Sequence, residues 1–127
     1  MRKSGVVLWG VLLGLSFSAL GERLQKLSST NAHEGPVCVS LQKRLYFTTF
    51  PDYRSAYNEI HYLDLDDFTI HPFIKDANMA NGMSFDKETQ SLLVAEQGTK
   101  NKKGCISRIS LNTKKRTVGK KKVSRSA

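Results

Sequence analysis

The chain has 127 residues, the size of one small domain. Its formal net charge of +9 would suit a nucleic-acid or membrane-surface protein if that charge covered the whole fold. Residues 114–127, however, hold seven basic residues and no acid, whereas residues 22–113 hold eleven basic and eleven acidic residues. The excess charge therefore lies in a tail. We expect no nucleic-acid partner, a disordered basic tail over residues 119–127, and polyanion contact, if any, through that tail.

The first twenty-one residues have the pattern of a secretory signal peptide. Arg2 and Lys3 form a basic start, residues 5–20 are an uncharged and mostly apolar run, and small residues suited to cleavage follow at positions 19–21. A retained signal anchor is the alternative, but the apolar run is shorter than the roughly 20 residues that span a bilayer. We therefore predict cleavage of residues 1–21, a secreted protein, and no stable membrane span after cleavage.

Export would place both cysteines, Cys38 and Cys105, in an oxidising compartment where a disulfide can persist. The sequence does not show that the two side chains meet. We favour the interpretation that both are small buried residues, because free cysteine is among the most buried residue types.

Residues 22–32 are polar and serine-rich and are predicted to be a lead-in linker. Beyond it, β-branched and aromatic residues follow a period of two, and no segment has a helical period. Residues that favour turns or interrupt regular structure punctuate these runs: Pro51, Asp66-Asp67, Pro72, Asn81-Gly82 and Gly98. The predicted strands are residues 44–49, 59–65, 70–74, 91–95, 105–111 and 117–118. Short strands at this spacing indicate an all-β sandwich, barrel or propeller.

An internal repeat favours the propeller. Gly35 and Gly82 are 47 residues apart, and residues 45–47 align with residues 92–94 at the same offset. After the next loop the offset becomes 46, which aligns Ile60 with Ile106 and Leu63 with Ile109. Units of about 40–50 residues with four short strands are the size of propeller blades. The predicted units are residues 35–73 and 82–118.

Six segments in this order resemble the senescence-marker-protein/gluconolactonase/luciferin-regenerating-enzyme family. They are His33-Glu34-Gly35-Pro36-Val37, Arg44–Phe47, Ile60–Asp64, Ala80–Asp86, Leu93–Gly98 and Gly104–Ile109. The resemblance covers residues 32–118 and implies that residues 33–118 are the first two blades of a six-bladed propeller. Since propellers need four or more blades to close, we expect a partial propeller and a fragment.

The resemblance also implies the residues of a site. Members of the family hold a divalent cation, usually calcium, in the central channel and hydrolyse sugar-acid lactones or related esters. Glu34 is implied to be a metal ligand, and Asn81 to line the substrate side of the channel, with Glu96 as a further candidate. Calcium favours such hard oxygen ligands, and a cation above a lactone carbonyl polarises it.

Each of these residues also has a simpler interpretation. Glu34 could be a solvated loop acid, Asn81 a turn residue, and Glu96 an exposed loop acid before Gly98. The family's later blades supply further ligands and the base, and where many relatives carry arginine two residues before the asparagine, this chain has Met79. We therefore expect no catalytic residue in this chain and a lactonase or esterase fragment that is inactive alone. A non-catalytic extracellular binding module is the alternative.

Overall fold

The structure, a computed structural model, describes residues 32, 34–50 and 57–119. The predicted signal peptide, His33 and the tail beyond Gly119 lie outside the described residues, as does the lead-in apart from Ala32. Within the described part of the chain, no helix is long and apolar enough to cross a membrane.

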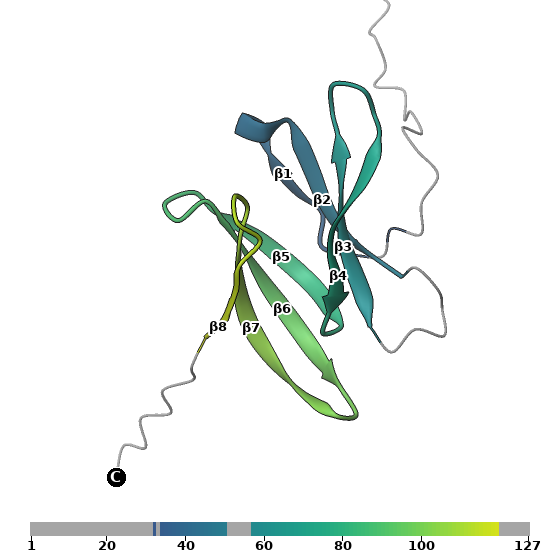
Figure 1. Cartoon of the computed structure of the whole chain (residues 1–127), viewed down its shortest axis with the longest axis vertical. Helices are drawn as coiled ribbons and strands as arrows, with labels where there is room; N and C mark the ends of the chain where they lie inside the picture. The colour runs from purple at the N-terminus through teal and green to yellow at the C-terminus, as the bar shows by residue number, and fades with distance from the viewer. Residues whose placement is uncertain (1–31, 33, 51–56, 120–127) are drawn as a thin grey trace, which may run out of the picture.

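The described residues form two four-stranded antiparallel sheets, so the prediction of an all-β fold is confirmed (Figure 1). In each sheet the strand order follows the chain order. A short 3-10 helix, η1 (Ser40–Gln42), joins the first two strands. The first sheet contains β1 (Val37–Val39), β2 (Arg44–Thr49), β3 (Asn58–Asp64) and β4 (Ile70–Ala77). The second sheet contains β5 (Ala80–Asp86), β6 (Ser91–Thr99), β7 (Lys102–Ser110) and β8 (Arg116–Val118).

Each sheet holds most of one predicted repeat unit, but β4 runs to Ala77, beyond the predicted end at residue 73, and β5 begins at Ala80, before the predicted start at residue 82. Some strand assignments were also wrong. β1 and β5 were not predicted, and the prediction that Asn81-Gly82 and Gly98 lie between strands is wrong. Gly98 lies inside β6. Asn81-Gly82 lies inside β5, where the pairing register with β6 shifts between Ala80 and Met83. Pro72 lies inside β4, in agreement with the predicted strand over residues 70–74, and among the described strands β4 pairs only with β3. An edge strand tolerates proline because one side of its backbone needs no ladder hydrogen bond.

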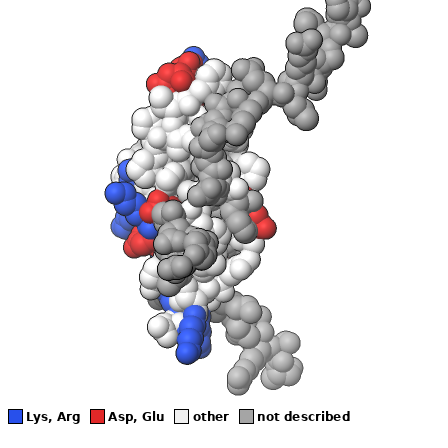
Figure 2. Space-filling view, turned by 90° about the vertical axis from the view of Figure 1, so that its right-hand side faces the viewer, with Lys and Arg blue, Asp and Glu red and all other residues white. Residues whose placement is uncertain are grey.

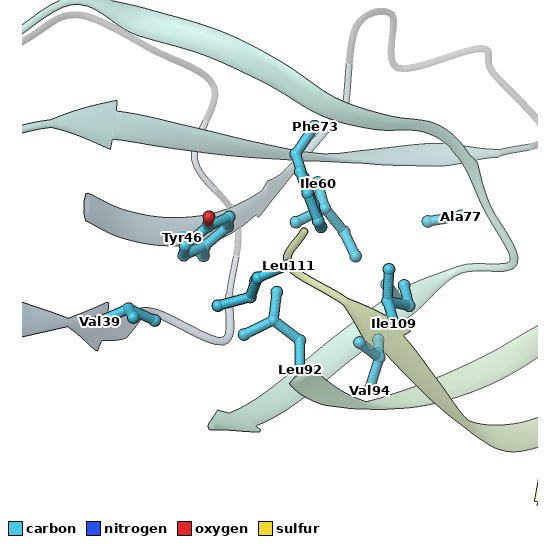
Figure 3. Packing of buried hydrophobic residues seen from close by; sticks show 10 residues of the cluster. Val39, Tyr46, Ile60, Phe73, Ala77, Leu92, Val94, Ile109 and Leu111 are labelled. Atoms are coloured by element: carbon cyan, nitrogen blue, oxygen red, sulfur yellow. The ribbon is translucent and has the colours of Figure 1, made fainter. Parts of the chain in front are cut away.

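One hydrophobic core lies between the two sheets, and strands of both contribute to it (Figure 3). Tyr46 packs edge-on against Phe73, with ring centroids 5.2 Å apart. Full burial of a large apolar side chain stabilises a fold by about 2 kcal/mol, so this core holds the sheets together. Its buried members are Val39, Tyr46, Ile60, Phe73, Ala77, Ala80, Leu92, Val94, Ile109 and Leu111.

Residues at equivalent positions of the two units point to opposite sides of their sheets. Ile60 is fully buried in the core, whereas its equivalent Ile106 is 57% exposed. Conversely, Ile109 belongs to the core, whereas its equivalent Leu63 is buried outside that cluster. Two sheets related by a two-fold axis would bury the same positions. The sheets therefore stack front to back, an arrangement compatible with successive blades.

Candidate functional site

Glu34 lies shortly before β1, separated from it by Gly35 and Pro36, and its backbone is fixed by the buried side chain of Thr48 in β2. The Glu34 N–H donates to Thr48 Oγ1 (3.1 Å), and Thr48 Oγ1 donates to the Glu34 carbonyl (2.8 Å). The Thr48 N–H also donates to that carbonyl, at 3.0 Å. The Glu34 side chain itself is exposed, so a rigid backbone presents a carboxylate to solvent.

Gly35, the residue after Glu34, lies against the backbone of Asn81. Gly35 has a positive φ of 66°, and a Cβ atom at this position would lie 2.2 Å from the Asn81 carbonyl oxygen. Only glycine permits this approach of β1 to β5. Asn81 lies 47 residues after Glu34, the offset that relates Gly82 to Gly35. The two candidate residues therefore occupy equivalent positions in adjacent units.

Asn58 fixes the start of β5, the strand that carries Asn81. This side chain is buried in β3 and bonds to both backbone groups of Ala80 in the second sheet. The sequence analysis did not single out Asn58. The available signal was a polar residue at the start of a strand whose alternate positions, such as Ile60, are apolar.

Glu96 lies in β6 opposite Ala80, and its side chain is completely buried. Its carboxylate forms an ion pair with the guanidinium of Arg116 in β8. It also accepts a hydrogen bond from the Cys105 thiol at 3.1 Å and a long one from the Asn78 N–H at 3.4 Å. The alternative that Glu96 is an exposed loop acid is therefore wrong. Its implied contact with substrate stays a prediction, and its carboxylate is committed to this buried cluster.

The same cluster shifts the pKa of the Cys105 thiol. Burial raises its pKa above the ordinary value, the hydrogen bond to the Glu96 carboxylate raises it further, and the Arg116 guanidinium opposes this shift. Cys38 is exposed in β1 and Cys105 is only half-buried, so the prediction that both cysteines are buried is wrong for Cys38 and is not met in full by Cys105. Both thiols are free.

The residues that could meet a cation at this site are Glu34 and Asn81. A carboxylate and an amide carbonyl are hard oxygen donors that suit calcium, which takes six to eight oxygens. Among the residues that the structure describes, no group of three or more His, Cys, Asp and Glu side chains could hold a metal ion. Water, or residues other than those described, would have to complete the coordination.

No protein-family model matches this chain, and no curated protein matches it either.

Proposed function

We propose that the chain carries the first two side chains of a calcium-dependent lactonase or esterase site in an exported, propeller-type protein. Glu34 would bind the cation, and Asn81 would orient a sugar-acid lactone or related ester. The single observation that carries the proposal is the close approach of Gly35, next to Glu34, to the backbone of Asn81. Glu34 and Asn81 themselves occupy equivalent positions of two front-to-back units.

The position of the two residues within the sheets supports this assignment. Glu34 precedes β1 and Asn81 lies in β5, and these are the first strands of their sheets. β5 contacts β1 across the interface between the sheets. Further units stacked in the same way would each add one residue at this position, so a ring of units would surround a central channel with polar side chains.

The chemistry of the two side chains is consistent with such a channel. A calcium ion held by Glu34 would polarise the carbonyl of a lactone and lower the pKa of an attacking water molecule. Asn81 could donate a hydrogen bond through its side-chain amide and so orient the substrate. Since the resemblance implies that later units supply further ligands and the base, we propose that the chain alone binds calcium weakly and does not turn over a lactone.

The test is a calcium titration of the chain followed by the amide resonances in ¹H–¹⁵N NMR spectra. We expect calcium to shift the resonances of Glu34, Gly35 and Asn81, with a dissociation constant of about 1 mM, typical of weak extracellular sites. Glu34→Gln should abolish these shifts, because it removes the carboxylate. Glu88→Gln is the matched control, since Glu88 is an exposed acid in the β5–β6 turn.

Two outcomes would contradict the proposal. Calcium shifts that survive Glu34→Gln would place the cation elsewhere. The absence of any localised shift up to about 10 mM calcium, well above the weak-site range, would favour the non-catalytic binding module instead. Saturable lactone turnover by this chain would exclude the binding module, and it would also contradict the proposal that the chain alone is inactive.

A further inference from the structure

The outer edge of β7 is only partly covered by its neighbour β8. β8 ends at Val118, which pairs with Ser107, and the last ladder bond runs from the Gly119 N–H to the Ile106 carbonyl at 2.9 Å. Among the described residues, no strand pairs with this edge from Lys102 to Cys105. An antiparallel strand directs part of its backbone groups to each side, so this stretch retains hydrogen-bonding capacity for one more strand.

A hollow opens beside this edge on the outer face of the second sheet. It has a volume of about 620 Å³ and extends from Ala95 and Gln97 of β6 across Gly104 and Ile106 of β7 to Gly119. The Ile106 side chain is 57% exposed there. A strand added at the edge would place alternate side chains over this hollow, where Ile106 offers an apolar contact.

The same end of β7 is strongly basic. Lys100, Lys102 and Lys103 are all exposed at the β6–β7 hairpin, and none of them forms an ion pair with a described acid. Figure 2 shows Lys and Arg side chains gathered at the lower end of the molecule, with no Asp or Glu beside them in that view. These lysines would favour an added strand that carries acidic side chains.

We propose that the edge of β7 from Lys102 to Cys105 binds an extended acidic peptide segment of another protein by strand addition. Backbone hydrogen bonds to β7 would supply affinity, the hollow would select an apolar residue, and the lysines would select carboxylates. This inference uses neither Glu34 nor Asn81, and it concerns the face of the second sheet that lies opposite the core. It applies to the two-unit chain, because a further unit stacked front to back would lie on that same face.

Other occupants fit the edge less well. A second copy of this chain would bring lysines against lysines, and edge lysines are a known device against self-pairing. The chain's own continuation after Gly119 begins with Lys120–Lys122, which would repeat that repulsion. A sulfated polysaccharide would satisfy the charges but would leave the backbone edge and the apolar hollow unused.

The test measures binding of a fluorescent eight-residue peptide that alternates glutamate with valine, by fluorescence anisotropy with the full chain. Lys102→Glu combined with Lys103→Glu should weaken binding at least about tenfold, because two attractions become repulsions. Ile106→Ser should weaken it severalfold. The control combines Lys75→Glu with Lys87→Glu, exposed lysines of β4 and the β5–β6 turn, and should leave the affinity unchanged.

A second probe separates strand addition from simple charge attraction. The same peptide methylated on alternate backbone nitrogens keeps its carboxylates but loses hydrogen-bond donors. Because strand addition depends on backbone hydrogen bonds, we expect its affinity to fall at least about tenfold. Equal affinity of the methylated peptide would overturn the proposal, and competition by a heparin oligosaccharide would then identify a polysaccharide site. The proposal would also be overturned by dimerisation that Ile106→Ser abolishes, or by peptide binding that requires removal of residues 120–127.

Discussion

Asn58 and Ala80 join the two sheets through a pair of hydrogen bonds between one side chain and one backbone unit. The Asn58 amide donates to the Ala80 carbonyl at 2.5 Å, and its carbonyl accepts from the Ala80 N–H at 2.8 Å. Asn58 thus acts like an added strand residue at the start of β5. It satisfies two backbone groups of Ala80, which is itself buried in the core.

Replacing Asn58 with alanine is expected to lower the free energy of unfolding by about 2–4 kcal/mol, because two buried backbone groups of Ala80 lose their partners. Urea unfolding followed by circular dichroism measures this change. Asn101→Ala, in the exposed β6–β7 turn, is the control and should stay within about 0.5 kcal/mol. Equal stability of the two variants would mean that the inter-sheet bonds contribute nothing net.

Gly35→Ala is expected to destabilise the fold by about 2–4 kcal/mol, because a side chain is strained at positive φ and its Cβ atom would collide with the Asn81 carbonyl. Gly82→Ala is the matched control at the equivalent position. Gly82 has no positive φ, and no atom lies within 4 Å of its added Cβ, so its stability should change by less than about 1 kcal/mol. Thermal unfolding of both variants provides the comparison, and a tolerated Gly35→Ala would refute the close approach of β1 to β5.

The front-to-back stacking predicts different responses to the same substitution at equivalent positions. Ile60→Ala should cost about 2–5 kcal/mol, because it leaves a cavity in the core. Ile106→Ala should change stability by no more than about 0.5 kcal/mol, because this side chain is mostly exposed. Chemical denaturation distinguishes the two, and comparable losses would indicate that both sheets bury the same face.

The reactivity of Cys105 should depend on Glu96 in a pH-dependent way. Alkylating agents attack the thiolate, so the raised pKa of Cys105 should slow its reaction at pH 8. Glu96→Gln removes a negative charge beside the thiol, which should lower the pKa of Cys105 and speed alkylation severalfold. The rate with iodoacetamide is measured between pH 7 and 10 in a Cys38→Ser background, where only Cys105 reacts.

The raised pKa of Cys105 also makes the free energy of unfolding depend on pH. The folded protein keeps the Cys105 thiol protonated to a higher pH than the unfolded chain does. This contribution to stability is therefore complete below the ordinary thiol pKa and is lost as the pH rises through the folded value. A pH–rate profile that Glu96→Gln leaves unchanged, with native circular dichroism retained, would contradict the coupling between the two groups.

The sequence by itself determined the all-β class, most of the strands, the two repeat units and the position of the excess charge. These properties depend on local patterns, because side chains alternate along a strand and turns require particular residues. The equivalence of Gly35 and Gly82 likewise required only a constant offset. Asn81-Gly82 misled the prediction because the same two residues suit both a turn and an irregular strand.

Only the tertiary structure decided which face of each strand is buried and what each polar residue contacts. Ile60 and Ile106 are the same residue at equivalent positions, yet only Ile60 meets the other sheet. Glu96 carries no local sign of burial, and its environment comes from Arg116, twenty residues further along the chain. Such contacts join residues that are distant in sequence, so they are fixed by the packing of one sheet on the other and not by any local pattern.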